Sequence, residues 1–400
     1  MTQTFKGLKI TSAFRSGILL RFLLLTFMFV FPGLKTEANT NYLELQIDTD
    51  AHIDSPDSIR QLQGNILQQE FHYFLRHRAL TMNDSIVSMP PFIKKVVGIY
   101  KWFDRTFNTH DTLYVGSSGY KGKVEAMGDS WIDAYYFHPH DMLSIRMLSD
   151  FYSSVGLKAQ YSILSLGYSV NVKHMSLSKS THRKTDLALN TARVSLEFHL
   201  WQNNGRTRIR KFGGYRDGAL IDELFEGLKF KSISFGGYYY FNYKKFSRSA
   251  AYDASNVQKR SQGTWIAGLS GTFYDARFDF TKLPIKLQEF YIYPFDTYRL
   301  YYNSINLVGG YSFNWVLSNH LTFNITAAPG IGMSITFSDS TDGRKVFPSY
   351  YLKGQGALTY TYKRLFATIS ARGDANLLQT ERVGFMTGFL DGKVSVGMRF

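Results

Sequence analysis

The chain has 400 residues and no cysteine, which excludes disulfide bonds, thiolate metal sites and a cysteine nucleophile. Its formal net charge of +15 suits either nucleic acid or an anionic lipid surface. Aromatic residues make up 16% of the chain, an abundance that a membrane barrel would use as girdles at its two interfaces.

The N-terminus has the three parts of a secretory signal peptide. Residues 1–21 carry basic residues and no acidic one, and the uncharged, mostly apolar run Phe22–Leu34 follows them. Thr36-Glu37-Ala38 then places small residues at the first and third positions of a cleavage site. We predict cleavage after Ala38, which makes residues 1–38 a signal peptide. An uncleaved signal anchor is the alternative.

Residues 39–110 form a predicted N-terminal extension, periplasmic or plug-like, with amphipathic helices. Ser55-Pro56-Asp57-Ser58 is suited to cap a first helix that runs through Phe71. A second helix is predicted to start at Pro90-Pro91, because apolar residues recur from there at helical spacing with basic residues between them. Two positions suit such a basic amphipathic helix: on a membrane surface, or against a barrel as a cap, a plug or an outer layer.

From residue 111 to residue 400 the apolar pattern has the period of two that β-strands need. In Arg193–Leu200 and in Ser304–Trp315, apolar side chains alternate with small polar or charged ones, which are poor material for the core of a sandwich. The alternating runs are roughly 10–15 residues long, against about 5–6 in globular proteins and 9–11 in a membrane-spanning strand. Their number predicts about twelve strands, within a range of about 10–14, and single-chain bacterial barrels favour even numbers.

The chain ends in another alternating run, in which Val394, Val396, Met398 and Phe400 share one face. A last strand that ends in an aromatic residue resembles the signal by which the barrel-assembly machinery recognises outer-membrane proteins. We therefore expect Phe400 to be a C-terminal assembly signal, and this machinery to be a partner.

A further motif lies between Phe241 and Asp275. It consists of Lys245-Phe246-Ser247, Ala250-Ala251, Gln258, Ser261 and Gly263-Thr264-Trp265. This pattern resembles the Bacteroidota proteins grouped as domain of unknown function 4421, with Thr264 where a serine is expected. The resemblance covers roughly residues 104–400. It implies an outer-membrane barrel and no assigned activity.

Few residue patterns suggest a catalytic or metal-binding site. His138-Pro139-His140-Asp141 has the spacing of metal ligands, but a solvated turn beside proline is the expected state, so we predict neither a metal nor a cofactor. Ser195 and His199 share one strand face about 13 Å apart, which is too far for a hydrogen bond. No G-x-S-x-G motif is present. No catalytic residue is therefore predicted, although a Ser–His pair across neighbouring strands remains an alternative.

Charged residues on the polar strand faces are the better candidates for a site. The candidate lumen-facing residues are Arg193, Glu197, His199, Arg372 and Arg399. Isolated buried charges are costly, so they either pair with one another or line water. A water-lined row would indicate a pore, and a paired network would indicate a plugged, structural barrel.

These patterns predict an all-β fold, a single transmembrane antiparallel β-barrel of about 12 strands with a short helical N-terminal extension. We expect a non-enzymatic protein of the cell outer membrane of a Gram-negative bacterium, either a passive channel or a structural or envelope-interaction barrel. A barrel-embedded lipid hydrolase or acyl-modifying enzyme and a secreted soluble β-protein are the alternatives. Expected partners are outer-membrane lipid, lipopolysaccharide and the barrel-assembly machinery, without nucleic acid. The sequence does not determine the strand register, whether the lumen is open or plugged, the substrate, or the oligomeric state.

Overall fold

The computed structural model describes Gln69, Tyr73, Val87 and residues 89–120, 122–139, 144–161, 164–172, 181–204, 206–291 and 295–400. The chain divides into two compact units, Met1–Lys101 and Trp102–Phe400. The predicted signal peptide lies outside the described residues, as does nearly all of the first predicted helix. The second is present as α5 (Pro91–Phe107). No helix in the described ranges is both long and apolar enough to cross a membrane.

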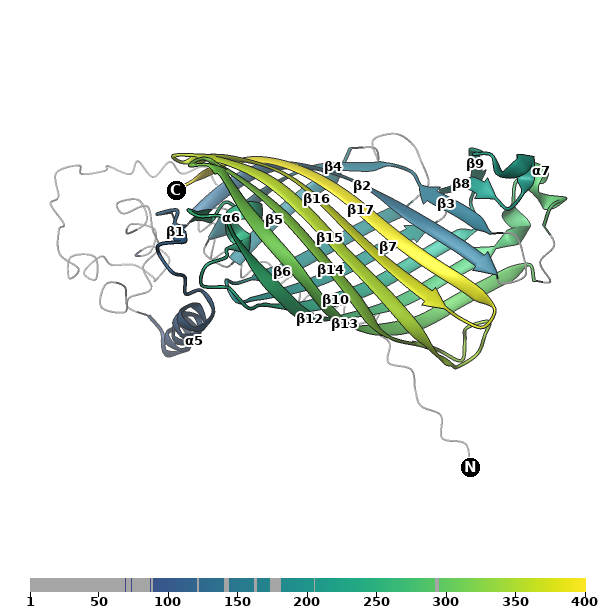
Figure 1. Cartoon of the computed structure of the whole chain (residues 1–400), viewed down its shortest axis with the longest axis horizontal. Coiled ribbons are helices and arrows are strands. Elements are labelled where there is room, and N and C mark those ends of the chain that lie inside the picture. Colours follow the sequence, from purple (N-terminus) through teal and green to yellow (C-terminus); the bar gives the residue numbers. More distant parts are fainter. Residues whose placement is uncertain are drawn as a thin grey trace, which may run out of the picture. The chain divides into compact units, whose positions relative to one another are not determined.

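The larger unit is a curled antiparallel sheet whose strands follow one another around a barrel wall (Figure 1). In the part of the chain that the structure describes, the wall has twelve strands, which confirms the predicted all-β antiparallel barrel fold. Within those ranges its two edge strands, β5 and β6, each pair on one side. In order around the wall, the strands are β5 (Leu164–Asn171), β4 (Tyr152–Tyr161), β2 (Gly122–Pro139), β17 (Val383–Arg399), β16 (Leu365–Gln379), β15 (Val346–Tyr362), β14 (Leu321–Thr336), β13 (Thr297–Ser318), β12 (Gln262–Asp279), β10 (Leu228–Tyr240), β7 (Val194–Asn204) and β6 (Thr181–Asn190).

The wall is polar inside and apolar outside, the reverse of a soluble protein. On β13, Ser304 and Asn306 are 2% and 0% exposed, whereas Ile305 and Leu307 are 59% and 65% exposed. The other long strands repeat this alternation, because successive side chains of a strand point to opposite faces of the sheet. The predicted assignment of faces along Ser304–Trp315 is therefore correct.

Several strands are longer than predicted. β13 has 22 residues, and β15 and β17 have 17 each. The extra length of β13 carries Tyr298, Leu300 and Tyr302, whose side chains point inward and are buried. At this level the inner face is apolar, so the pattern of one apolar and one polar face does not reveal the start of the strand.

The two ends of the barrel differ. At the end that holds the C-terminus, residues 319–320 and 363–364 make tight turns between neighbouring strands. Long connections join the strands at the opposite end, where Figure 1 shows the short strands and α7. The elements of these connections are β3 (Ile145–Ser149), β8 (Thr207–Phe212), η2 (Tyr215–Gly218), β9 (Glu223–Phe225), η3 (Phe280–Lys282) and α7 (Ile285–Gln288).

An aromatic cluster fills the long-connection end of the barrel. The rings of Phe137 and Phe278 lie 4.8 Å apart, and those of Phe137 and Tyr298 lie 5.4 Å apart. Phe385 and Phe280 are also fully buried there. These rings come from β2, β12, β13, β17 and η3, so the cluster ties the wall strands to the connections above them.

In the middle of the wall, two adjacent glycines of β13 lie opposite a proline of β14. The pairing of β13 with β14 is interrupted at Gly309 and Gly310, opposite Ala328 and Pro329. Proline cannot donate to the ladder. A Cβ at Gly310 would lie 2.3 Å from the Ala327 carbonyl oxygen, whereas nothing lies within 4 Å of a Cβ at Gly309. The close approach of the two strands therefore requires glycine at position 310 alone.

We expect Gly310→Ala to lower the free energy of unfolding by about 1–3 kcal/mol, because the added methyl group meets backbone that cannot move away. The matched control Gly309→Ala should leave it unchanged or raise it by up to about 1 kcal/mol, through the unfolded state. Urea unfolding of the micelle-bound protein measures both. Equal destabilisation by the two substitutions would contradict this account of the strand approach.

Candidate functional site in the barrel interior

The connection between β10 and β12 folds back into the barrel. We call residues 241–261 the inner loop; it holds α6 (Arg248–Tyr252) and β11 (Asn256–Gln258), and β11 pairs with β1 (Val115–Ser117). Ser247 caps α6, because its hydroxyl accepts from the backbone N–H of Ala250 at 3.3 Å. Phe246, Ala250 and Ala251 are buried. The inner loop is thus a compact element, unlike the tight turns beside it.

Gln258 connects the inner loop to itself and to the wall. Its Oε1 accepts from the backbone N–H of Ser247 at 2.9 Å and from Asn314 Nδ2 at 3.1 Å. Its Nε2 donates to the carbonyl oxygens of Lys245 at 2.7 Å and Arg260 at 3.0 Å. Both ends of this buried amide are satisfied, as a buried polar group requires.

α6 forms hydrogen bonds with the polar inner face of the wall. Tyr252 donates to Asn324 Oδ1 at 2.7 Å, and the Thr359 hydroxyl donates to the carbonyl oxygen of Ala251. Asn324 in turn donates to Asn314 Oδ1 at 2.7 Å. The small polar side chains of β13, β14 and β15 therefore bind protein at this level.

Charged groups anchor the C-terminal end of α6. The ammonium group of Lys158 lies 3.9 Å from the Asp253 carboxylate, and Lys123 donates to the Asp253 carbonyl oxygen. Burial would raise the pKa of Asp253, but Lys158 and Lys123 hold this pKa below its ordinary value, so the carboxylate is charged at neutral pH. Arg399 donates to the Ala254 carbonyl oxygen at 3.1 Å.

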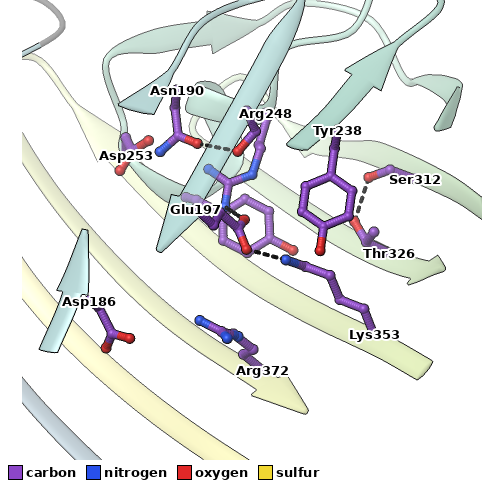
Figure 2. A network of polar contacts seen from close by, with 12 residues as sticks. Asp186, Asn190, Glu197, Tyr238, Arg248, Asp253, Ser312, Thr326, Lys353 and Arg372 are labelled. Atoms are coloured by element: carbon purple, nitrogen blue, oxygen red, sulfur yellow. Dashed lines mark hydrogen bonds and ion pairs between the residues drawn. The ribbon is translucent and has the colours of Figure 1, made fainter. Parts of the chain in front are cut away.

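A central charge cluster lies beside the inner loop, with Glu197 at its middle. Lys353 donates to the Glu197 carboxylate, and Arg248 of α6 lies 3.6 Å from it (Figure 2). Glu197 and Lys353 are 6% and 4% exposed, so neither charge is screened by bulk water. Because the negative charge faces two positive ones, burial of the cluster is tolerated.

The cluster continues towards β6 and β16. His199 Nδ1 lies 2.5 Å from the Asp186 carboxylate, and its Nε2 lies 3.5 Å from Glu197. Arg372 pairs with Asp374, which also accepts from the Tyr351 hydroxyl at 2.7 Å. Glu197, His199, Arg372 and Asp374 border a cavity of about 20 Å³. That volume holds about one water molecule.

The structure places four of the five predicted lumen residues inside the barrel. Glu197, His199 and Arg372 meet in the central charge cluster, and Arg399 contacts the inner loop. Arg193 lies in the turn before β7, where its guanidinium stands 4.3 Å from the Tyr243 ring.

Four partners in the central charge cluster were not predicted from the sequence. These are Asp186, Arg248, Lys353 and Asp374. They come from separate strands and from the inner loop, so only the strand register brings them together. Alternation places Lys353 and Asp374 on the polar faces of their strands, and that is the signal that could have found them.

The C-terminal residue continues the last strand pair. The backbone N–H of Phe400 donates to the Gly122 carbonyl oxygen at 2.8 Å, and that of Gly122 donates back at 3.0 Å. A Cβ at Gly122 would lie 2.4 Å from the Phe400 ring, so glycine leaves room for that ring. The predicted role of Phe400 as an assembly signal stays a prediction.

The geometry of the described residues favours no familiar catalytic arrangement. Ser195 Oγ donates to Asn190 Oδ1 at 2.6 Å, and the two ring nitrogens of His199 face Asp186 and Glu197. The described residues contain no group of three or more His, Asp or Glu side chains placed to hold a metal ion. His140 and Asp141 lie outside the described residues.

Strand order and inverted polarity together define an antiparallel β-barrel class of protein. The family model "Domain of unknown function (DUF4421)" matches residues 109–400, so the chain belongs to this family, as the resemblance predicted. None of the curated proteins matches the chain.

Solved structures with some similarity include three bacterial proteins. The outer membrane protein OprG from Pseudomonas aeruginosa is 11% identical, with a TM-score of 0.25 and coverage of 71% of this chain and 99% of that one. The translocator domain of the autotransporter NalP from Neisseria meningitidis is 10% identical, with a TM-score of 0.27 and coverage of 77% and 96%. The toluene transporter TodX from P. putida is 7% identical, with a TM-score of 0.21 and coverage of 74% and 97%. The barrel fold follows from the strand pairing described above.

The family motif coincides with the inner loop and its two attachments. Phe246 is buried and stacks with Tyr240 at 6.0 Å. The hydroxyl of Ser261 accepts from the backbone N–H of Val316, and that of Thr264 accepts from Asn242, both at 2.9 Å. The motif residues therefore support the inward fold of this connection.

We expect Gln258→Met to release the inner loop, because it leaves the backbone N–H of Ser247 and two carbonyl groups without their partner, at about 1–3 kcal/mol for each group. Hydrogen exchange of the backbone amides in residues 241–261 measures the release. The control is Gln355→Met: Gln355 follows Lys353 on the inward face of β15, outside the inner loop. Unchanged protection in Gln258→Met would contradict the role given to this amide.

Proposed function

We propose that this protein is an outer-membrane β-barrel with a closed interior, which acts as a structural or envelope-interaction protein and not as a passive channel. The observation that carries the proposal is a polar interior occupied by the inner loop and the paired central charge cluster, inside a wall with an apolar exterior. Lipid satisfies no backbone polar groups, so an exposed apolar wall of this kind suits a membrane crossed by paired strands.

The height of the apolar exterior fits a bilayer. On β12 the outward residues from Trp265 to Phe273 span about 26 Å along the strand. A tilt of roughly 35–45° reduces this to about 20 Å, close to the apolar band of about 25 Å on outer-membrane barrels. Trp265 and Tyr311 pack edge to face at 5.1 Å on this exterior, as an interfacial girdle would.

The unequal ends support an orientation. Outer-membrane barrels have short periplasmic turns and longer extracellular loops. We therefore assign the end with the inner loop and the C-terminus to the periplasm, and the end with the aromatic cluster to the cell exterior. The predicted signal peptide, the origin in a Gram-negative member of the Bacteroidota, and the role of Phe400 towards the barrel-assembly machinery belong to this proposal.

Experiments distinguish the two alternative functions, a lipid hydrolase and a secreted β-protein, from the proposed one. Release of fatty acid from lipid by the purified protein, lost in His199→Ala, would favour the hydrolase. Recovery of the protein in the soluble fraction would favour a secreted β-protein.

A charge placed on the outer wall tests membrane insertion. We expect Leu269→Arg, at the middle of the apolar band, to lower the free energy of unfolding in lipid bilayers by about 2–4 kcal/mol. The control is Leu220→Arg in the connection between η2 and β9, where a more exposed leucine should tolerate arginine within about 0.5 kcal/mol. Leu269 and Leu220 are 54% and 78% exposed. Equal tolerance of both substitutions would place the wall in water.

Planar bilayers test the closed interior. We expect the full chain to insert without conductance steps, because the inner loop and the paired central charge cluster occupy the interior. Faster gel migration of the unboiled sample than of the boiled one confirms that the same preparation holds a folded barrel. Regular conductance steps from such a preparation would reject the closed interior and favour a passive channel.

A further inference from the structure

Four basic residues gather on the outside of the wall at the long-connection end. We call Lys229, Lys231, Arg277 and Arg299 the rim patch. Lys229 of β10 lies directly opposite Arg277 of β12, which lies opposite Arg299 of β13. Their side chains point outward; the two lysines are exposed, and the Arg277 side chain is 56% exposed. Like charges placed directly opposite on neighbouring strands destabilise a sheet, so a row of three cations needs compensation.

The protein supplies only part of that compensation. Asp275 accepts from Arg277 at 2.8 Å and from Arg299 at 3.0 Å, so one carboxylate serves two guanidinium groups. Asp339 lies 3.6 Å from Arg299. Among the described residues, no acidic side chain lies within ion-pair distance of Lys229 or Lys231. Four cations therefore face two carboxylates: Lys231 stands directly opposite Asp275 without an ion pair to it, Lys229 stands opposite Arg277, and neither lysine has an ion-pair partner in the described part of the chain.

The rim patch directly adjoins the apolar exterior of the same strands. Ile233 follows Lys231 on the outward face of β10, and Phe273 precedes Asp275 on the outward face of β12. Successive outward residues of a strand are about 6.6 Å apart. An anion held by the patch would therefore lie next to the apolar surface of Phe273, which is 45% exposed.

We propose that the rim patch binds the phosphate group of an outer-leaflet lipid whose acyl chains lie along the apolar wall below it. The proposal rests on the outer-membrane location proposed above, and it deepens that function by naming a lipid-binding site. Lysine and arginine are the side chains that bind phosphate oxygens with charge-assisted hydrogen bonds. A soluble anion would use the ammonium groups alone, whereas a phospholipid or lipid A molecule uses both the charge and the apolar surface beside it.

The test is lipid binding by the full chain in detergent micelles, counted by native mass spectrometry. The probes are diphosphoryl lipid A and the same lipid after removal of both phosphates. We expect wild-type protein to retain diphosphoryl lipid A in preference, and Lys229→Gln with Lys231→Gln to bind it about thirtyfold more weakly, on the order expected for two lysines at an anionic membrane surface. Inorganic phosphate at equal concentration should not displace the lipid.

The matched control removes two other lysines at the same end. Lys282 and Lys286 lie in η3 and α7, and they pair with Asp279 and Glu223. Their joint replacement by Gln makes the same change in net charge and should alter lipid binding by less than about twofold, because both lysines already have partners.

Three results would overturn the proposal: equal retention of dephosphorylated lipid A, unchanged binding in the rim-patch variant, or displacement by inorganic phosphate. Gel migration before and after boiling separates these results from failure of the proposed function. A heat-modifiable barrel without phosphate preference removes the lipid site alone. A preparation that shows no heat-modifiable barrel removes both proposals.

Discussion

The barrel depends on how its inward-facing polar side chains are satisfied. A wall with an apolar exterior turns its Ser, Asn, Thr and charged residues towards the lumen, and each of them needs either water or protein. Here the inner loop supplies the protein. Gln258 makes hydrogen bonds in both directions, and Asn314 and Asn324 of the wall receive the loop as its partners. The inward fold of one connection therefore gives partners to polar side chains on β13, β14 and β15.

The central charge cluster follows from the same constraint. Glu197 would be costly on its own inside a filled lumen, and it is tolerated because Lys353 and Arg248 face it. Arg248 belongs to α6, so the cluster also holds the inner loop in place. At the other end an apolar core takes over, and there the strands no longer need polar side chains inside. The interior thus changes along the barrel axis from hydrogen-bonded loop to charge cluster to aromatic core.

Much of this fold could be predicted from the sequence, because alternation reports directly on the two faces of a strand. Ser304–Trp315 shows the inverted polarity residue by residue, and the inner-loop motif was recognisable before its geometry was known. The charge cluster could not be assembled in the same way. Asp186, Lys353 and Asp374 lie far apart in sequence, and a register change of one residue would turn each of them outward. The aromatic end was not predicted either, since at the start of β13 the apolar residues Tyr298 and Leu300 lie on the inner face and Arg299 on the outer one, so the alternation has the opposite phase there.

We expect this barrel to bind its partners on its outer surfaces and not in its lumen. The charged groups of the central cluster are paired with one another, and the pocket beside them has room for about one water molecule, so they offer little room for a substrate. The groups that retain binding capacity lie elsewhere, on the outer wall and at its rim, where Lys229 and Lys231 form no ion pair with a described carboxylate. The paired interior gives those surfaces a stiff support, because each strand is fixed both by its neighbours and by the side chains it buries. In this barrel the lumen groups therefore contribute to stability, and the groups on the exterior are available for interaction.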